Sequence, residues 1–526
     1  MGIVTMFVLM FPIIMLNGTY TGSMLEVSST LGILSEDITM GYYAAAAGMA
    51  VAYPIIPKIR AIATPKTMLL TDLILQIFLS YVCAQVGNMD ITIMVSGTTS
   101  ASACYKPELS LTCTQTPVVE GYDWGPGVKA TILAFNRVLA PRSIRAEDIL
   151  SVVEHKESMD WANIGGPHIV ASAPRTVTAA YPCTKEGKKL EAPSRYLCLE
   201  MPCDPNTGSP FCYDFLVGMN NWCKPYELEI TLKEDAALAT ILGQKIIATV
   251  DPVVDHQDAV IPQMKHFVTD GVFRGTDGKE LTYGYYAPKG QKLPLVIWLH
   301  GAGEGGTDPS IAFLGNKASA LLGEEFQQAM GGAAYVLLPQ TPTFWLQYNE
   351  AGDWGNNPGV PSVYTQTLKE LIDNFVAEHP AIDRDRILIG GCSNGGYMTV
   401  NMAIQYPGYF AAAYPICEAY KDSGITPEQL DTLKDLPMWF VYAENDTTVD
   451  PAVYEAPTLA RLKAVDAKVH TSIFADVHDT TGLYKGDDGQ PYQYMGHWSW
   501  LYFFNRQCKD DITGQDLWTW LGQQSK

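Results

Sequence analysis

The chain of 526 residues lacks an excess of positive charge: 35 Lys and Arg stand against 56 Asp and Glu, for a formal net charge of −21. Such an acidic surface repels the phosphates of DNA and RNA, so no nucleic-acid partner is expected. The sequence also contains no internal repeat and no low-complexity tract. The absence of a repeat of about 40–50 residues excludes a β-propeller. Apolar residues make up 47% of the chain, which predicts a folded protein. The length of 526 residues is too great for one compact core and predicts several domains.

The eleven cysteines include no Cys-x-x-Cys pair, and no histidine lies between Cys183 and Cys223. Both absences count against a zinc site. Zinc nevertheless remains the alternative to disulfides for the closely spaced cysteines of this segment, Cys198, Cys203, Cys212 and Cys223. Seven cysteines lie between residues 104 and 223. This density favours disulfides and an oxidising compartment outside the cytoplasm.

Three long hydrophobic runs lie near the N-terminus. Residues 1–25 and 38–57 carry no charge, and residues 67–89 carry a single one. Each run reaches the length of about 20 residues that a membrane-spanning helix needs, and the first lacks the basic start of a signal peptide. The basic stretch 58–66 is expected on the cytoplasmic side, which places the later residues outside. Residues 1–86 are therefore predicted to form a membrane-associated helical segment.

Residues 87–264 alternate short β-rich runs with clusters of Gly, Pro, Asn and Asp. The runs are ITIMVSG, KATILAF, YELEITL and KIIATVDPVV. Short strands with frequent turns predict a β-sandwich, and we expect an immunoglobulin-like accessory domain. The segment is longer than a sandwich of roughly 100 residues. A Cys-rich loop at 183–223 is expected to account for much of the excess.

Residues 265–526 alternate apolar runs with helical stretches. The helical stretch around 363–378 places its apolar residues on one face. Continuous apolar runs are typical of strands that are buried on both faces. They lie at 293–300, 333–340, 386–391, 411–417, 438–443 and 470–477. This order predicts an α/β fold with a doubly wound, mainly parallel sheet.

The sequence Gly391-Cys392-Ser393-Asn394-Gly395 lies between a predicted strand and a predicted helix. A G-x-S-x-G motif in this context indicates the nucleophile elbow of an α/β-hydrolase, with Ser393 as the nucleophile. Small neighbours let the chain close a sharp turn, and the helix N-terminus directs free N–H groups at a developing negative charge.

A glycine-rich loop, His300-Gly301-Ala302-Gly303-Glu304, follows the strand at 293–300. In α/β-hydrolases such a loop supplies one N–H of the oxyanion hole, and the residue after the nucleophile supplies the other. These roles are predicted for the backbones of Ala302 and Asn394. His300 is predicted to orient the loop. A phosphate-binding loop is disfavoured because no Gly-Lys-Ser/Thr follows.

The acid and the base of a triad follow the nucleophile in this fold. Asp446 is the preferred acid because it comes soonest after the strand at 438–443 while allowing a turn; Asp450 and Glu444 are its alternatives. The histidines that follow Asp446 are His470, His478 and His497. His497 is preferred over His478 because it lies in a Gly-His-aromatic loop before a helical stretch, and His470 falls within a predicted strand.

Four segments of residues 265–526 resemble secreted and lipoprotein esterases known as predicted peptidases, relatives of feruloyl esterases and polyhydroxybutyrate depolymerases. They are LPLVIWLHGAGEGG, RILIGGCSNGGYMT, YAENDTTV and GHWSWLYFFN. The resemblance implies the triad Ser393, Asp446 and His497, and an immunoglobulin-like domain before the hydrolase. Separately, residues 41–67 resemble the second helix and basic loop of a major facilitator transporter. Transport is not expected, because the hydrophobic pattern stops after three runs.

The predicted function is that of a serine carboxylesterase for short-chain or aromatic esters of feruloyl or acetyl type, free or linked to polysaccharide. It needs neither metal nor cofactor. The alternatives are a prolyl-oligopeptidase-type serine peptidase and a non-catalytic surface binding protein. Trp345, Trp354 and Trp498 lie in or beside loops of the expected active edge and are candidate substrate contacts. The protein is expected to be periplasmic or secreted, with possible membrane association through residues 1–86.

Overall fold

The computed structural model describes residues 108–526 except 142–143, 242, 356 and 358–359. The hydrophobic segment predicted at 1–86, with its transporter resemblance, and the β-rich run at 91–97 lie outside the described residues. Within the described part of the chain, no helix combines the length and the apolar character that crossing a membrane requires.

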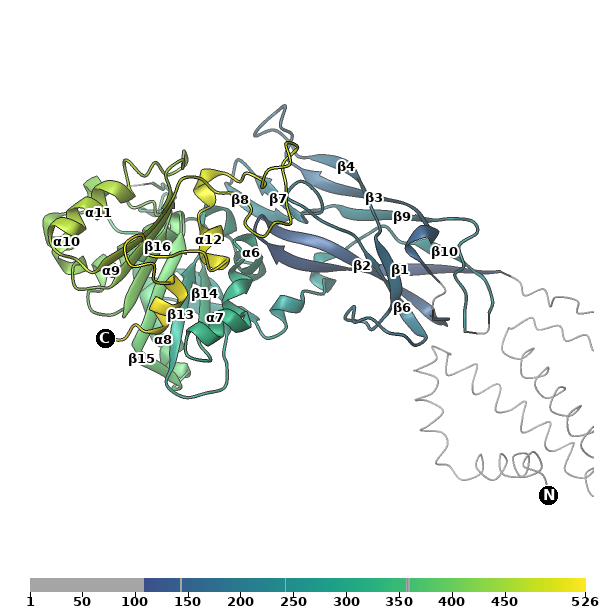
Figure 1. Cartoon of the computed structure of the whole chain (residues 1–526), viewed down its shortest axis with the longest axis horizontal. Coiled ribbons are helices and arrows are strands. Elements are labelled where there is room, and N and C mark those ends of the chain that lie inside the picture. Colours follow the sequence, from purple (N-terminus) through teal and green to yellow (C-terminus); the bar gives the residue numbers. More distant parts are fainter. Residues whose placement is uncertain (1–107, 142–143, 242, 356, 358–359) are drawn as a thin grey trace, which may run out of the picture.

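A β-rich part precedes an α/β part, and the two lie side by side along the long axis of the molecule (Figure 1). In the β-rich part, one sheet has the strand order β10-β1-β2-β6-β5 and a second has the order β4-β3-β9. A separate hairpin pairs β7 with β8. The strands are β1 (Leu109–Tyr122), β2 (Gly125–Leu139), β3 (Ile149–Ser158), β4 (Ile169–Arg175), β5 (Ala179–Cys183), β6 (Ser194–Glu200), β7 (Phe211–Asp214), β8 (Met219–Trp222), β9 (Tyr226–Leu232) and β10 (Ile246–Val250).

The segment 183–223 was expected to be a Cys-rich loop, and this expectation is wrong. The segment contains strand β6, which pairs with both β2 and β5, and also the whole β7–β8 hairpin. Three consecutive residues of β6, Leu197, Cys198 and Leu199, are buried, so burial does not alternate along this part of the strand. Their side chains pack into two apolar clusters, which shows that both faces of the strand are covered. The cysteines of this segment therefore belong to strands or to the turns that join them.

The expected disulfides are not formed among the described residues, where all nine cysteines are free. Cys392 and Cys417 each lie at the end of a buried strand, where the sequence allows either a bridge or two free buried thiols; the thiols are free, and the parallel register pairs Cys392 with Ile416. Both thiols are fully buried, and burial raises the pKa of each well above its usual value. Cysteine is among the most buried residue types, so a buried free thiol satisfies the apolar pattern equally well.

The α/β part is built on one eight-stranded sheet with the order β11-β12-β14-β13-β15-β16-β17-β18. The pairs from β14 through β18 are parallel, and the edge strands β11 and β12 are antiparallel. The mainly parallel sheet confirms the predicted fold class of this part. Its strands are β11 (Val268–Arg274), β12 (Glu280–Tyr286), β13 (Leu293–Leu299), β14 (Tyr335–Gln340), β15 (Ile382–Cys392), β16 (Ala412–Ile416), β17 (Met438–Ala443) and β18 (Val469–Phe474).

Helices cover both faces of this sheet. On β13, Leu295 and Ile297 pack into a core with residues of α8 and α9, whereas Val296 and Trp298 pack into a core with residues of α7 and α12. This division follows from the alternation of side chains along a strand. The helices are α6 (Pro309–Gly315), α7 (Glu324–Ala329), α8 (Thr365–Glu378), α9 (Asn394–Gln405), α10 (Pro427–Leu433), α11 (Glu455–Ala464), α12 (Trp500–Phe504) and α13 (Leu517–Gly522).

The two parts share one apolar core, which runs from the sandwich strands to the helices behind the sheet. At their junction the rings of Phe267 and Phe313 stack with centroids 4.3 Å apart. Lys317 and Asn505 both donate hydrogen bonds to the buried Asp123 carboxylate, at 2.5 and 2.8 Å. A continuous core with buried polar links holds the two parts in a defined arrangement.

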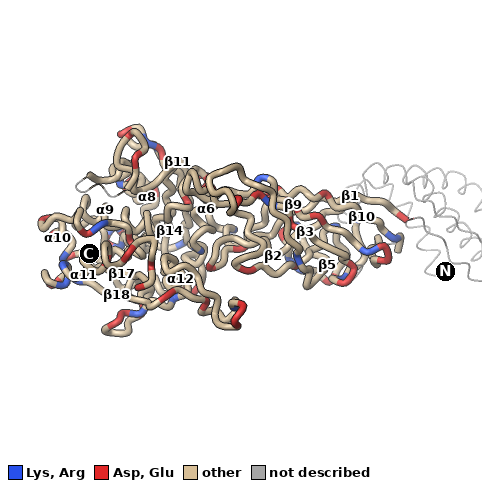
Figure 2. Tube along the Cα trace, turned by 90° about the horizontal axis from the view of Figure 1, so that it is seen from above, with Lys and Arg blue, Asp and Glu red and all other residues tan. Residues whose placement is uncertain are grey.

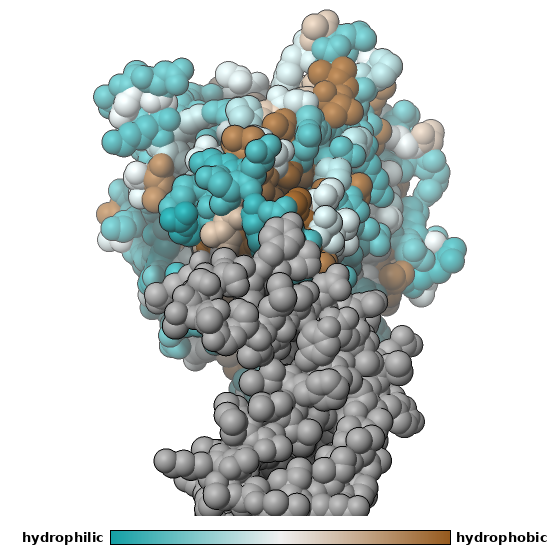
Figure 3. All heavy atoms as spheres, turned by 90° about the vertical axis from the view of Figure 1, so that its right-hand side faces the viewer, coloured by the Kyte–Doolittle hydropathy of each residue, from teal (hydrophilic) through white to brown (hydrophobic). Residues whose placement is uncertain are grey.

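The surface is polar and mixed in charge. Acidic and basic residues are spread over loops and helix ends along the whole described chain (Figure 2). On the face shown in Figure 3, hydrophilic residues surround separate apolar patches.

Candidate active site

Ser393 stands on a sharp turn between strand β15 and helix α9. Its backbone has φ 55° and ψ −116°, a conformation that non-glycine residues rarely adopt. A Cβ atom at Gly395 would lie 2.0 Å from the carbonyl oxygen of Leu299. Only glycine therefore lets the first turn of α9 approach β13 this closely. The geometry is that of a nucleophile elbow, with a strained serine at the carboxyl edge of the sheet.

Two backbone N–H groups lie at helix starts beside this turn. Asn394 is the first residue of α9, and Ala302 is the first residue of the short 3₁₀ helix η4 (Ala302–Glu304). A backbone N–H at such a position has no acceptor within its own helix. The Asn394 side chain is buried, and its Oδ1 accepts a hydrogen bond from the Leu346 N–H at 2.9 Å. Asn394 thus joins the elbow to the loop that follows β14.

His300 is fully buried between the glycine-rich loop and the loop after β14. Its Nε2 accepts a hydrogen bond from the Thr341 N–H at 3.2 Å, so the proton is assigned to Nδ1, which donates to the Gly301 carbonyl at 2.6 Å. Burial lowers the pKa of His300 to about 4. The ring is therefore neutral near pH 7 and links two loops of the active edge.

Asp446 and His497 are brought together across 51 residues of sequence. His497 Nδ1 lies 2.7 Å from Asp446 Oδ2, and both side chains are buried. The other oxygen, Oδ1, accepts the N–H groups of Thr448 and Val449 at 2.8 and 2.9 Å. Three partners therefore fix the carboxylate. Asp446 follows β17 and Ser393 follows β15, and the carboxyl ends of parallel strands meet at one edge of a sheet.

The alternative acids and bases occupy other surroundings. His470 lies 3.1 Å from Asp510 and stacks on Trp439, and His478 lies 2.6 Å from Asp476. Each histidine thus has an aspartate of its own. The alternative acids Asp450 and Glu444 are exposed to solvent.

The three candidate tryptophans differ in exposure. Trp345 is 0% exposed and packs edge-on against Tyr364, so it offers no surface to a substrate; its proposed role in binding does not fit this position. Trp354 is 58% exposed and packs against Phe344 at 4.8 Å between ring centroids. Trp498 is half-buried beside His497, between Tyr494 and Trp500.

Three buried carboxyl groups near this edge were not singled out from the sequence. Burial raises the pKa of Glu304 to about 7 and that of Glu418 to about 8, and it raises the pKa of Glu455 well above its usual value. Glu304 ends the η4 turn of the glycine-rich loop, and Glu418 lies two residues after the end of β16. For Glu418 the available sequence signal was an acidic residue just after a buried apolar strand.

A separate cluster in the β-rich part contains side chains of the kinds that bind zinc. The ligand atoms of Glu157, His168 and Cys212 all lie within 4.8 Å of one another. Glu157 already accepts hydrogen bonds from His168 at 2.8 Å and from the Lys224 N–H at 2.8 Å. The sequence search for a histidine between the cysteines missed His168 because it precedes them in the chain.

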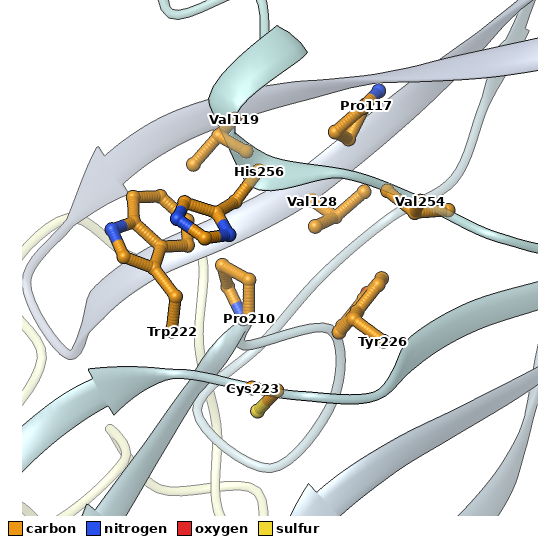
Figure 4. A pocket seen from close by; sticks show the side chains of 9 residues that line it. All are labelled: Pro117, Val119, Val128, Pro210, Trp222, Cys223, Tyr226, Val254 and His256. Carbon is orange, nitrogen blue, oxygen red and sulfur yellow. The ribbon is translucent and has the colours of Figure 1, made fainter.

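A small cavity in the β-rich part is lined mostly by apolar side chains from strands β1, β2, β8 and β9 and from neighbouring loops (Figure 4). In its wall the rings of Trp222 and His256 stack with centroids 4.9 Å apart. None of the candidate catalytic residues lines it.

Comparison with known proteins identifies the two parts. Residues 286–482 match the phospholipase/carboxylesterase family, and residues 114–246 match the esterase Ig-like N-terminal domain. Residues 286–482 are thus similar to carboxylesterase-family α/β-hydrolases. This finding confirms the resemblance seen in the sequence, both for the hydrolase and for the immunoglobulin-like domain before it.

Two individual proteins show how far the similarity of this chain extends. Poly(3-hydroxyalkanoate) depolymerase C of Paucimonas lemoignei is 32% identical over 149 residues, which is 27% of this chain and 32% of that protein. The chain therefore spans about a third of the length of this relative. The crystal structure of a thermostable esterase aligns with a TM-score of 0.58 at 21% identity, over 78% of this chain and 99% of that chain. That alignment shows that the two-part fold is shared.

Proposed function

We propose that this esterase hydrolyses short-chain or aromatic carboxylic esters, free or linked to polysaccharide, with Ser393, His497 and Asp446 as its catalytic triad. The observation that carries the proposal is the His497–Asp446 hydrogen bond at the sheet edge that also bears the strained Ser393 turn. An acid-held imidazole at the same edge as a nucleophile elbow is the arrangement that acyl transfer requires.

In this mechanism His497 Nε2 takes the proton of Ser393 Oγ while that oxygen attacks the ester carbonyl carbon. Asp446 keeps the proton of the imidazole on Nδ1 and stabilises the imidazolium that forms. The N–H groups of Ala302 and Asn394 stabilise the tetrahedral oxyanion. His497 then protonates the leaving alcohol as the carbon–oxygen bond breaks. Water attacks the acyl-enzyme with His497 again as base, releasing the carboxylic acid and restoring Ser393.

The test is Ser393→Ala, assayed with p-nitrophenyl acetate and p-nitrophenyl butyrate. Loss of a triad serine reduces turnover by about 10⁶-fold, and the melting curve is expected to stay unchanged. Ser423→Ala, at an exposed serine after β16, is the matched control and keeps wild-type rates. A fluorophosphonate probe is expected to label the wild type and the control but not Ser393→Ala. Turnover within tenfold of wild type in folded Ser393→Ala would refute the assignment.

We further propose that esters are cleaved in preference to peptide bonds. An amide nitrogen must be protonated as it leaves, so a site arranged for alcohol leaving groups cleaves amides slowly. The deciding measurement compares kcat/KM for an ester and an amide of the same acyl group. An amide rate equal to the ester rate, lost in Ser393→Ala, would establish the peptidase alternative.

We also propose that the enzyme acts outside the cytoplasm. The hydrophobic runs at 1–86 and the basic stretch at 58–66 support this location. The cysteine density no longer adds support, because the described cysteines are free. Protease added to intact cells is expected to degrade the hydrolase; full protection of the hydrolase would contradict this location.

A further inference from the structure

Glu304 is the acidic residue of the loop that carries Ala302, and it is only 6% exposed. Its Oε1 accepts a hydrogen bond from Asn220 Nδ2 at 3.3 Å. Its backbone carbonyl accepts another from Gln340 Nε2 at 2.9 Å, which ties the end of η4 to strand β14. A Cβ atom at Gly315 would lie 2.6 Å from Glu304 Cγ, so the side chain fills its site without spare room.

The Glu304 carboxylate also lies close to the turn that carries Ser393. A Cβ atom at Gly301 would lie 3.0 Å from Glu304 Oε2 and 3.5 Å from Cys392 Sγ. The carboxylate is therefore close to the residue before Ala302 and to the residue before Ser393. Polar groups of Asn316, Asn220 and the Gly301 backbone favour its ionised form and oppose the burial that raises its pKa.

Asn220 reaches this loop from the immunoglobulin-like domain. It belongs to β8, and the β7–β8 hairpin packs on the oxyanion loop: a Cβ atom at Gly303 would lie 2.9 Å from Asn220 Nδ2, and one at Gly305 would lie 2.7 Å from Met219 Cε. The hairpin is fixed at its base by Trp222, whose Nε1 donates to Asp308 Oδ2 at 3.0 Å and whose ring stacks on His256 (Figure 4).

We propose that Glu304 is a positioning residue that holds the Ala302 N–H toward the oxyanion, and that Asn220 of the immunoglobulin-like domain is its partner. The inference rests on the proposed function. In this arrangement the accessory domain forms part of the support of the oxyanion hole. Neither residue touches the substrate; both act through the backbone between Gly301 and Glu304.

Ionisation leaves both carboxylate oxygens of Glu304 as acceptors: Oε1 accepts from Asn220 Nδ2, and Oε2 faces the backbone at Gly301. The other titratable groups that face it stay neutral between pH 5 and 9. His300 is neutral because burial lowers its pKa to about 4, and burial raises the pKa of Tyr213 and of Cys392. Protonation of Glu304 as the pH falls through about 7 therefore loosens the loop.

The experiment compares Glu304→Gln and Asn220→Ala with Asn221→Ala, an exposed neighbour on the same hairpin, in the full-length enzyme. Glu304→Gln keeps the shape of the side chain but places an amide where acceptors are needed. We expect kcat to fall about tenfold to a hundredfold with little change in KM, because removing an oxyanion donor outright costs about 10²–10³-fold. Asn220→Ala is expected to lower kcat by a smaller factor, and Asn221→Ala to keep the wild-type value.

Two readouts separate positioning from a merely structural role. An aryl boronic acid forms a tetrahedral adduct with the serine, and we expect its affinity to fall in Glu304→Gln by the same factor as kcat. On the acid side, the slope of log kcat/KM against pH is expected to exceed one in wild type and to equal one in Glu304→Gln. Unchanged kcat and boronate affinity in Asn220→Ala and Glu304→Gln would overturn the proposal while Ser393→Ala remains inactive; if Glu304→Gln does not fold, Asn220→Ala alone decides. Activity in Ser393→Ala would instead overturn the proposed function.

Discussion

Asp446→Asn is expected to abolish most of the esterase activity without disturbing the fold, and the surroundings of Asp446 explain why. Oδ1 accepts the N–H groups of Thr448 and Val449, and Oδ2 accepts the His497 Nδ1–H. An asparagine must keep its carbonyl oxygen toward the two backbone N–H groups. Its NH₂ group then faces His497 Nδ1, which has to act as acceptor. The imidazole proton moves to Nε2, and His497 is no longer able to take the proton of Ser393.

The expected loss follows from this tautomer change. The same substitution in a serine protease triad lowers kcat by about 10⁴-fold, which corresponds to about 5 kcal/mol of transition-state stabilisation. The assay is p-nitrophenyl butyrate hydrolysis at pH 7.5, with the melting temperature as a check on folding. Asp476→Asn, which alters the partner of His478, is the matched control and is expected to keep its activity. Folded Asp446→Asn with kcat within tenfold of wild type would refute both the tautomer argument and the choice of Asp446.

Further predictions concern the base, the domain junction, pH and the thiols. His497→Ala is expected to lose activity as fully as Ser393→Ala, whereas His478→Ala keeps most of it; the reverse pattern in initial rates would make His478 the base. Asp123→Ala leaves the Lys317 ammonium without its buried carboxylate, and we expect the free energy of unfolding, measured with urea, to fall by about 2 kcal/mol. This is less than the roughly 3–5 kcal/mol for breaking a fully buried pair, because Lys317 is partly exposed. A fall of less than about 0.5 kcal/mol would count against a structural role for the junction. Burial raises the pKa of Glu304 to about 7 and of Glu418 to about 8, so the native state retains protons that the unfolded chain releases above pH 4.5. The stabilising contribution of these protons to the free energy of unfolding therefore falls as the pH rises from 4.5 to 8. In the double variant Glu304→Gln/Glu418→Gln, we expect the free energy of unfolding to depend less on pH between pH 5 and 8. Peptide mapping without reduction is expected to find Cys392 and Cys417 alkylated after unfolding, and a linked peptide would show that the bridge exists.

The hydrolase sheet was predictable from the sequence because each of its buried strands is a continuous apolar run. The run MWFVYA coincides with β17, and the helical stretch predicted at 363–378 contains α8. Parallel strands covered on both faces leave such runs without the alternation that a half-exposed strand has. The elbow was equally clear, since its glycines and Ser393 are contiguous in the sequence.

The β-rich part was harder to predict because its strands are defined by distant pairing. Strand β6 lies in a segment that was interpreted as a Cys-rich loop, yet it is hydrogen-bonded on both sides, to β2 and β5. Cysteine content did not distinguish disulfides from free thiols, because both place a cysteine among apolar residues of the sequence. The metal-ligand types near Cys212 were missed for a related reason: His168 is brought close only by strand pairing.

The same limitation hid the dependence of the active site on the accessory domain. Local motifs pointed to Ala302 and Asn394, which begin η4 and α9, but no motif connects Asn220 with Glu304, which are 84 residues apart. The contact exists because one apolar core continues from the sandwich into the hydrolase and presses the β7–β8 hairpin onto the oxyanion loop. A loop that is rich in glycine has little rigidity of its own. The packing of a second domain against it supplies the constraint that the loop lacks, and this gives the immunoglobulin-like domain a physical reason to accompany the hydrolase in one chain.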